Sequence, residues 1–483
     1  MISSRNVGAS GDWDPVRSSL AYWDVVSSAS NIWWTRRLGR NAVDAARRAR
    51  FESIVQFARA RSPFYRAALH GLPERGLAPF MLPVTSKRQL MARFDDWVTD
   101  PRVTRAGVAA FLDDRGNIGR PFLDRYLVWK SSGTDGETGI FVQDPDAIAT
   151  YNALMGVQLE ASGVAARAAL GLATQGNRAA LVIATGDHFA SIASWRSATG
   201  AYPWLAARSY SVLDPLPELV RALNAWQPAF LASYPTALSL LADEQSAGRL
   251  RIAPVCLWSG GECLAPHAGA AIERAFGCPL QDEYGASEAL SIAFRCREGW
   301  LHVNADWVIL EPVDQDYQPT PEGEPSHTVL LTNLANRIQP IIRYDLGDSV
   351  IARAAPCACG NPLPAIQVEG RRDEVLSMRA PDGTLVRLLP IALTTVVEEA
   401  ADLHRFQIVQ TGRAELALRV ALDDRASRLA AFAAVSRDLH HYLARNSLPN
   451  VKVSLAAGPP LPDERSGKLR AVVATHAPDT AQC

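Results

Sequence analysis

Four short segments of the chain carry residue types that could handle an anionic nucleotide. The first, 131–139, reads Ser-Ser-Gly-Thr-Asp-Gly-Glu-Thr-Gly. Small residues free the backbone to wrap around an anion, and hydroxyls add hydrogen-bond donors. Such a loop can hold a triphosphate, although a Ser/Gly-rich surface loop explains this segment equally well by itself. It is not the P-loop of kinases and GTPases, because no Gly-Lys-Ser/Thr sequence ends it.

The second segment, 282–288, reads Asp-Glu-Tyr-Gly-Ala-Ser-Glu. The ring of Tyr284 could cover the face of a purine. Ser287 and Glu288 could meet phosphate and Mg²⁺, since Mg²⁺ prefers oxygen ligands and shares them with phosphate. The alternative is an ordinary turn after a strand.

The remaining two segments add a carboxylate and several basic groups. The segment 343–348 reads Arg-Tyr-Asp-Leu-Gly-Asp, and a carboxylate at a strand end can bind both hydroxyls of a ribose. The segment 369–373, Glu-Gly-Arg-Arg-Asp, is followed near the C-terminus by 465–470, Arg-Ser-Gly-Lys-Leu-Arg. A lone lysine in a polar loop is normally just exposed, so Lys468 gains meaning only beside the other segments.

A different chemistry is indicated by a group of cysteines and a histidine. Cys296 and His302 stand six positions apart, and the pair Cys357 and Cys359 follows in a Cys-Ala-Cys-Gly turn. Three thiols and one imidazole can close a tetrahedral zinc site, and with no open coordination position that zinc would be structural. The alternatives are four unrelated residues in a reduced protein, or His327 as the fourth ligand.

The elements that must position these segments read as alternating strands and helices. With 483 residues the chain is too long for one compact core, so two or more domains are expected. The first hundred residues read as helical, with 32–60 at helical spacing and Ser86 as a helix cap. Strands alternating with helices predict an α/β fold with a mainly parallel sheet. The expected strands are 179–184, 229–232, 254–258 and 329–332, and the expected helices between some of them are 217–224 and 236–247.

A smaller α+β unit is expected at the end of the chain, after a break near 370–373. The sequence Pro-Asp-Gly at 381–383, between apolar flanks, predicts a hairpin. Strands at 406–410, 415–421 and 451–456 and a helix at 426–443 complete this unit.

Composition excludes several classes of protein. The formal net charge is −1, from 49 basic and 50 acidic residues. The chain therefore lacks the excess of basic residues that is typical of a nucleic-acid-binding protein. No run of about 18 apolar residues predicts a membrane span, and the N-terminus does not read as a signal peptide. Seven cysteines are few for this length and favour the reducing cytoplasm. Three of them, Cys256, Cys263 and Cys278, lie in apolar contexts and are expected to be buried.

Taken in this order and at these separations, the four segments resemble the adenylate-forming superfamily of acyl-CoA synthetases, peptide-synthetase adenylation domains and luciferases. The similarity is greatest to its phenylacetate–CoA ligase branch, and phrases at 62–65, 82–85, 233–236 and 259–262 support that branch. The resemblance covers nearly the whole chain. It implies a large multi-subdomain domain, 1–370, that binds ATP and the acid and contains the zinc site, and a small mobile lid, 371–483. In such enzymes ATP and a carboxylic acid give an acyl-AMP and pyrophosphate, the lid swings, and a thiol then attacks.

The resemblance also implies roles for individual residues. The residues expected to bind phosphate are Ser131, Ser132, Gly133, Thr134 and Gly136. Gly261 and Tyr284 are expected to contact the adenine, with Glu262 and Gly285 beside them. Asp348 is expected to bind the ribose, with Arg371 nearby. The catalytic group consists of Ser287 near the α-phosphate, Glu288 as the Mg²⁺ ligand and Lys468 as the lysine of the first half-reaction. Asp373 marks the hinge, and Gly260 and Tyr234 mark the acid side. His188 is placed on the acid or the thiol side, and a purely structural histidine is the alternative.

The resemblance favours an aromatic acid as substrate and leaves the acceptor open between coenzyme A and the phosphopantetheine arm of an acyl carrier protein. A homodimer is implied by analogy alone. One departure from the family pattern is Asp135, a carboxylate inside the phosphate loop. It permits an alternative, a degenerate member that binds nucleotide without turnover as a scaffold or regulator. A third alternative is a ligase that stops at the adenylate or transfers to an amine or hydroxyl.

Overall fold

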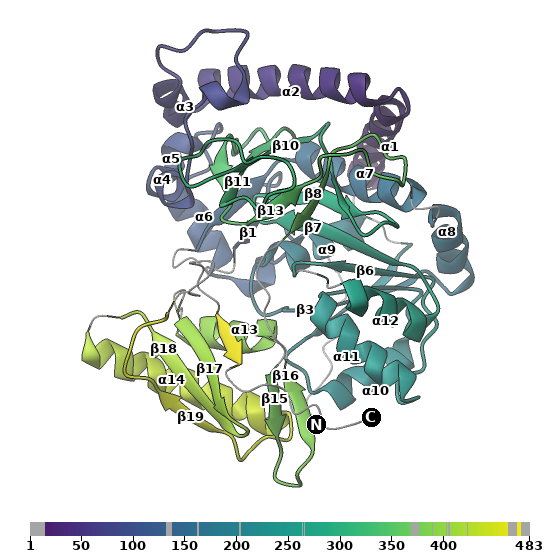
Figure 1. The fold of residues 1–483 in the computed structure, drawn as a ribbon, viewed down its shortest axis with the longest axis vertical. Coiled ribbons are helices and arrows are strands. Elements are labelled where there is room, and N and C mark those ends of the chain that lie inside the picture. Colours follow the sequence, from purple (N-terminus) through teal and green to yellow (C-terminus); the bar gives the residue numbers. More distant parts are fainter. Residues whose placement is uncertain are drawn as a thin grey trace.

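The computed structural model describes residues 15–131, 138–161, 164–201, 204–262, 264, 266–368, 376–388, 390–401, 403, 406–422, 424–461 and 471–474. Figure 1 shows the helices of the first hundred residues at one end of the molecule and the C-terminal elements at the other, with a large sheet between them. This arrangement of strands and helices confirms the predicted α/β fold class with a small C-terminal sheet unit.

A nine-stranded sheet forms the centre of the described structure. In spatial order its strands are β13 (Val350–Ala352), β14 (Ala365–Val368), β9 (Leu301–Val303), β8 (Ala289–Arg295), β7 (Leu280–Ala286), β6 (Cys256–Gly260), β5 (Phe230–Ser233), β3 (Arg178–Ile183) and β4 (Ala206–Ser211). The pairings from β4 to β7 are parallel, and those from β7 to β13 are antiparallel. Because β3, β5, β6 and β7 run in one direction, their carboxyl ends meet at one edge of the sheet.

Four helices connect the parallel strands: α9 (Ala190–Ala201), α10 (Leu216–Trp226), α11 (Pro235–Ser246) and α12 (Pro266–Phe276). Two more, α7 (Pro145–Ala161) and α8 (Ala165–Thr174), precede β3. The nearly continuous burial of β3 and β6 is typical of parallel strands covered on both faces. The predicted strands and helices of this part are confirmed, with the strand expected at 254–258 lying two residues later, in β6.

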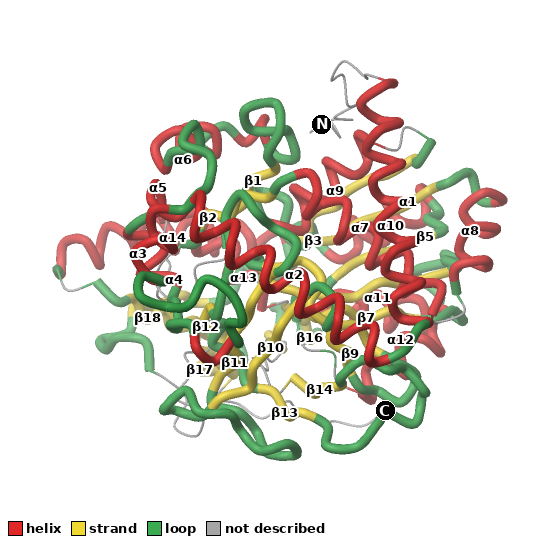
Figure 2. Tube along the Cα trace, turned by 90° about the horizontal axis from the view of Figure 1, so that it is seen from above, coloured by secondary structure: helices red, strands yellow, loops and turns green. Residues whose placement is uncertain are grey.

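The N-terminal helices pack against the antiparallel side of the molecule. They are α1 (Pro15–Arg37), α2 (Arg40–Arg61), α3 (Pro63–Ala68), α4 (Lys87–Ala92), α5 (Phe94–Trp97) and α6 (Arg105–Leu112), with short 3₁₀ turns η1 (Pro79–Met81) and η2 (Arg115–Asn117). The prediction of one helical stretch over 32–60 is wrong at Gly39, where φ is +88° and the helix ends. Glycine adopts this left-handed conformation readily, so α1 and α2 are separate helices, and α1 lies along α7 (Figure 2).

The predicted helix cap at Ser86 is confirmed. The Ser86 hydroxyl accepts a hydrogen bond from the backbone N–H of Gln89 at 3.4 Å, and the Gln89 side chain accepts one from the backbone N–H of Ser86 at 3.1 Å. This reciprocal pair is a capping box, which fixes the start of α4.

Two small sheets flank the large one and carry parts of the four sequence segments. The first pairs β1 (Leu127–Lys130) with β2 (Ile140–Gln143), so its turn contains the segment 131–139. The second has the order β10 (Val308–Val313), β11 (Thr328–Asn333) and β12 (Tyr344–Asp345), and contains the start of the segment 343–348.

The C-terminal elements form two further sheets with two helices (Figure 1). The elements are β15 (Leu376–Arg379), β16 (Leu385–Leu388), α13 (Pro390–Ala401), β17 (Phe406–Gly412), β18 (Glu415–Val420), α14 (Arg425–Arg445), β19 (Lys452–Leu455) and β20 (Val472–Ala474). The predicted hairpin is confirmed: β15 pairs with β16, Gly383 has φ +87°, and Asp382 Oδ1 accepts the Thr384 N–H at 2.9 Å. The expected break at 370–373 lies outside the described residues.

Two aromatic side chains in the N-terminal core make buried polar contacts with the loop before β12. The Tyr65 hydroxyl donates to the carbonyl oxygen of Pro340 at 3.0 Å and accepts the N–H of Ile342 at 3.2 Å. Trp97 Nε1 donates to the same Pro340 oxygen at 2.6 Å. Both side chains are fully buried, so these bonds tie the N-terminal helices to the segment that carries the 343–348 motif.

Among the described helices, none is long and apolar enough to cross a bilayer.

Tyr65→Phe should destabilise the protein, because it leaves the Ile342 N–H unpaired in the core and removes a donor from Pro340. A buried unpaired group of this kind costs about 1–3 kcal/mol. We expect a lower thermal unfolding midpoint for Tyr65→Phe and an unchanged midpoint for the control Tyr22→Phe, whose side chain is 48% exposed. Equal midpoints for the two variants would contradict this account of the contact.

Candidate active site

The candidate active site lies where four parallel strands end. Ser233 at the end of β5 is opposite Ser259 of β6, and Ser259 is opposite Asp282 of β7. The residues that follow these strands therefore lie side by side. They are 184–188 after β3, Tyr234 after β5, Gly261 after β6 and the segment 282–288 at the end of β7.

Tyr234 and Gly261 form one wall of the site. Gly261 has φ +81°, and a Cβ at this position would lie 3.1 Å from Cε1 of the Tyr234 ring. Glycine is therefore required both for the backbone conformation and for the approach of the ring. The carboxylate of Glu262 accepts hydrogen bonds from Thr236, at 3.1 Å from the backbone nitrogen and 2.6 Å from Oγ1. These bonds attach the loop after β6 to the first turn of α11, where a negative charge is favourable.

A hydrogen bond joins two of the predicted motifs. The Tyr284 hydroxyl donates to Oδ2 of Asp348 at 2.7 Å, although the two residues are 64 positions apart in the sequence. This contact brings the proposed adenine residue and the proposed ribose residue together. The sequence segments 282–288 and 343–348 thus belong to one site.

Glu288 is held by a second residue of the 343–348 segment. The Tyr344 hydroxyl donates to Oε1 of Glu288 at 2.7 Å, and Glu288 is buried. Burial raises the pKa of the Glu288 carboxyl, and the charge of Lys87 opposes that shift. Carboxylates that bind metal ions are commonly oriented by such a hydrogen bond, so Glu288 fits the predicted role of a Mg²⁺ ligand.

Two backbone carbonyls of the segment 282–288 are also fixed by side chains. Trp129 Nε1 donates to the carbonyl oxygen of Ser287 at 2.9 Å, and Asn333 Nδ2 donates to that of Glu288 at 3.0 Å. Sequence reasoning did not identify Trp129, Asn333 or Tyr344. Tyr344 lies inside the segment 343–348, and Trp129 stands two positions before Ser131. Their position in or next to these segments is the sequence feature that could have identified them as site residues.

Gly285 permits the bend that presents Tyr284. The register of β7 against β8 shifts between Tyr284 and Ala286, which marks a β-bulge. A Cβ on Gly285 would overlap the backbone carbonyl oxygen of Leu290 on the facing strand. Bulges of this kind redirect neighbouring side chains, and here the glycine lets the two strands stay close at the bulge.

The loop expected to bind phosphate is closed at its base by two hydrogen bonds. The Ser131 N–H donates to the carbonyl oxygen of Gly139 at 2.8 Å, and the Gly139 N–H donates to the Ser131 hydroxyl at 2.8 Å. Several predicted residues lie outside the described part of the chain: Ser132, Gly133, Thr134, Asp135 and Gly136 of this loop, Arg371, Asp373 and Lys468.

Two further carboxyl groups of β7 lie next to Tyr284 in the sequence: Asp282 is buried and Glu283 is partly buried. The Ser259 hydroxyl donates to Oδ1 of Asp282 at 2.5 Å, and burial raises the pKa of Asp282 to about 6. Burial also raises the pKa of Glu283 to about 7. Sequence reasoning quoted both residues without giving either a role.

His188 is fully buried after β3. Its Nε2 donates to the carbonyl oxygen of Asp114 at 3.1 Å, and its Nδ1 has no hydrogen-bond partner among the described residues. Burial lowers the pKa of the imidazole. The bond to Asp114 fits the structural interpretation, and the free Nδ1 leaves the acid-side interpretation open.

The four predicted zinc ligands come together. The sulfurs of Cys296 and Cys357 are 3.7 Å apart, and the Cys359 sulfur is 3.2 Å from Nε2 of His302. The four ligand atoms all lie within 4.8 Å of one another, and His327 is not in this group. His302 Nδ1 donates to the Leu363 carbonyl oxygen at 2.9 Å, which leaves the Nε2 lone pair for a metal. Tetrahedral zinc–thiolate bonds place two sulfurs about 3.8 Å apart, so the geometry fits zinc.

The cysteines outside this group behave as expected where they are described. Cys256 and Cys278 are buried, as the apolar sequence around them predicts. Cys263 lies outside the described residues.

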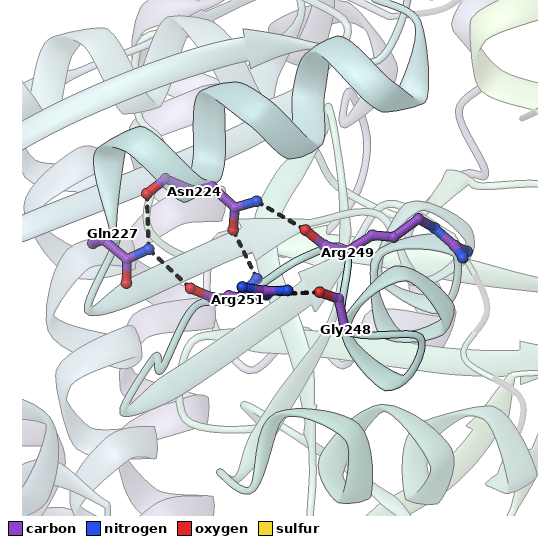
Figure 3. A pocket seen from close by; sticks show the side chains of 5 residues that line it. All are labelled: Asn224, Gln227, Gly248, Arg249 and Arg251. Carbon is purple, nitrogen blue, oxygen red and sulfur yellow. Dashed lines mark hydrogen bonds between the residues drawn. The ribbon is translucent and has the colours of Figure 1, made fainter.

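A surface depression of about 550 Å³ lies at the ends of α10 and α11 (Figure 3). The Asn224 side chain donates to the Arg249 carbonyl and accepts the Arg251 N–H, at 2.9 and 2.7 Å. Gln227 Nε2 donates to the Arg251 carbonyl at 2.9 Å. These amides hold the turn after α11, and the depression contains none of the motif residues.

Comparison with solved structures identifies the fold. A 2-hydroxyisobutyryl-CoA ligase in complex with its acyl-AMP and CoA, in the thioesterification state, superposes over 89% of both chains with a TM-score of 0.52 and 21% identity. This chain has the fold of the adenylate-forming enzymes. An open conformation of the same ligase has a TM-score of 0.49 at 21% identity and covers 90% of this chain and 91% of the ligase. The superposition with the TM-score of 0.52 confirms the adenylate-forming fold that the resemblance predicted.

Sequence comparison gives less. No known family model matches the chain. Protein CapK of Staphylococcus aureus is 26% identical over 139 residues, which span 28% of this chain and 29% of CapK. The matched region is therefore less than a third of either protein. The phenylacetate–CoA ligase branch of the adenylate-forming enzymes stays a prediction.

Gly285→Ala should disrupt the site, because its Cβ would overlap backbone of β8 and neither strand can yield without losing ladder hydrogen bonds. We expect a lower thermal unfolding midpoint, with a loss of about 1–3 kcal/mol that is typical of overpacking. The control is Gly156→Ala in α7, where a Cβ meets nothing within 4 Å and alanine favours a helix. An unchanged midpoint for Gly285→Ala would show that the bulge does not depend on this glycine.

Proposed function

We propose that this protein is an ATP-dependent carboxylate ligase that forms an acyl-AMP, releases pyrophosphate and transfers the acyl group to a thiol. The observation that carries the proposal is the hydrogen bond of 2.7 Å between Tyr284 and Asp348. It joins the expected adenine and ribose residues at the carboxyl ends of the parallel strands, where α/β folds bind nucleotides. The adenylate-forming fold supports the same conclusion.

The chemistry requires two anions to meet. The carboxylate of the acid attacks the α-phosphate of ATP, and negative charge builds on the phosphate oxygens in the transition state. Lys468 supplies an ammonium group that offsets this charge, and removal of such a group typically costs about a hundredfold or more in rate. Glu288, oriented by Tyr344, would hold Mg²⁺, which would neutralise phosphate charge when bound.

The acid side of the site supports an aromatic substrate. Tyr234 is buried with its ring against Gly261, and Trp195 packs on the same apolar cluster. An aryl group can pack against such rings with a favourable edge or offset geometry. We place the acyl group beside Tyr234 and Gly260, within the phenylacetate–CoA ligase branch. The acceptor is a pantetheine thiol, of coenzyme A or of a carrier protein.

We also propose that Cys296, His302, Cys357 and Cys359 hold a structural Zn²⁺. Cys296 and His302 lie on either side of the β8–β9 turn. In this turn the Cys296 N–H donates a hydrogen bond to the carbonyl oxygen of Trp300 at 2.8 Å. Cys357 and Cys359 lie between β13 and β14. Zinc would therefore tie the strands after the Tyr284 motif to those that follow the Asp348 motif.

Lys468→Ala should separate the two half-reactions. The variant should lose acid-dependent formation of acyl-AMP by about a hundredfold or more, because the charge on the α-phosphate is no longer offset. Thioester formation from supplied acyl-AMP should largely survive. The matched control is Lys452→Ala, an exposed lysine of β19, which should retain both steps. Equal loss of both half-reactions in Lys468→Ala would contradict the assigned role.

Metal analysis of the purified protein should find about one zinc per chain, since tetrahedral Cys₃His sets are typical of structural zinc sites. Cys357→Ser should lose the zinc and lower the thermal midpoint. Cys278→Ala, at a buried cysteine outside the cluster, should keep it. A metal-free wild-type protein with the same stability as Cys357→Ser would rule out the site.

A further inference from the structure

Helix α13 of the C-terminal unit packs against the segment 185–188, which follows β3 in the large sheet. The approach is close at Gly186: a Cβ there would overlap the carboxylate of Glu399. Glu399 Oε2 also lies 4.0 Å from Nη2 of Arg115, which precedes the two-stranded sheet. The contact therefore joins the C-terminal unit to the edge of the candidate active site.

Three carboxyl groups meet at this contact, and they are unequally paired. Asp187 Oδ1 lies 3.6 Å from Nζ of Lys130, and Glu399 has Arg115 nearby. Among the described residues, no cation forms an ion pair with Glu398. Its Oε1 is buried and has no hydrogen-bond partner there, and the charges that act on it are those of Asp187 and Glu399.

The charge of Glu398 also acts on Tyr234, on the wall of the site. Burial raises the pKa of Tyr234, and the negative charges of Glu262 and Glu398 raise it further, to about 12. Tyr234 therefore stays neutral and cannot offset a negative charge on Glu398. Among the described residues nothing would compensate a negative charge on Glu398, whose Oε1 is buried, and such a charge is strongly unfavourable.

We propose that docking of α13 on the segment 185–188 is coupled to the uptake of a proton by Glu398, so that the C-terminal unit leaves this position more readily as the pH rises. The proposal concerns the contact alone and does not depend on the proposed activity.

The direction follows from linkage. Burial, then Asp187 and Glu399, raise the pKa of Glu398 to about 9 in the docked arrangement, whereas an exposed glutamate titrates near 4.3. A raised pKa means that docking is most stable below the pKa of the exposed carboxyl. Stability of the contact then falls as the pH rises through the interval up to about 9, by up to tenfold in the docking equilibrium per pH unit.

Hydrogen–deuterium exchange of the full chain tests this between pH 6 and 8.5, after correction for the intrinsic pH dependence of amide exchange. Peptides from α13 and from the segment 179–188 should lose protection together as the pH rises, by up to about tenfold per unit. Glu398→Gln should sharply reduce this dependence, because a neutral amide replaces the protonated carboxyl; the smaller part that remains comes from Glu399, whose pKa burial also raises. Gly186→Ala should reduce protection of both peptides at every pH, since its Cβ displaces Glu399.

The matched control is Glu415→Gln, at an exposed carboxylate of β18 in the same C-terminal unit, which should behave like the wild type. Wild-type protection that does not change with pH would overturn the proposal. So would a pH dependence that persists undiminished in Glu398→Gln. Neither readout requires ATP, an acid or a thiol, so failure here would leave the proposed ligase function untouched, and the reverse also holds.

Discussion

The parallel register of β5, β6 and β7 determines which side chains can meet at the candidate active site. Ser233, Ser259 and Asp282 lie opposite one another, so the residues that follow each strand emerge at one edge. A shift of one residue in any pairing would turn Tyr284 to the other face of the sheet. The hydrogen bond of Tyr284 to Asp348 depends on this register, and so does the packing of Tyr234 on Gly261.

Around this edge, buried polar contacts fix what the strands present. Tyr344 orients Glu288, Trp129 and Asn333 hold the carbonyls of the same turn, and Ser259 binds Asp282. Such contacts are costly to leave half-made in a low-dielectric interior, so they restrict the site to one arrangement. The carboxyl groups of Glu288, Asp282, Glu283 and Glu398 all have raised pKa values because burial disfavours their charge. Cationic partners, whether Mg²⁺, an ammonium group or a proton, would be stabilised here.

Much of the fold could be predicted from local sequence. The runs of apolar residues in β3, β5 and β6 and the Pro-Asp-Gly turn between β15 and β16 have strong local signals, and the structure confirms them. The break at Gly39 was missed because helical periodicity continues on both sides of it, whereas the φ of +88° is a property of one residue. The cluster of Cys296, His302, Cys357 and Cys359 was predictable because three thiols and an imidazole in two short groups match a known set of metal ligands.

The contacts that join distant segments could not be predicted in this way. Nothing in the spacing of Tyr284 and Asp348, or of Glu288 and Tyr344, gives a distance between them, since that depends on the register of the strands. The same holds for Glu398, which lies in α13, a helix that the sequence analysis did not predict, and whose surroundings depend on the packing of α13 against Gly186. Tertiary packing decides the charge state of such groups, and sequence patterns do not contain it.

Acid-dependent ATP–pyrophosphate exchange is the most direct test of the proposed function. A panel of benzoates, phenylacetates, cinnamates and short fatty acids would be offered to the wild-type protein with Mg²⁺ and labelled pyrophosphate. The account predicts exchange with one group of aromatic acids and little with the fatty acids. Binding of ATP without exchange for any acid would contradict it, and would favour a nucleotide-binding protein whose phosphate loop is impaired by Asp135.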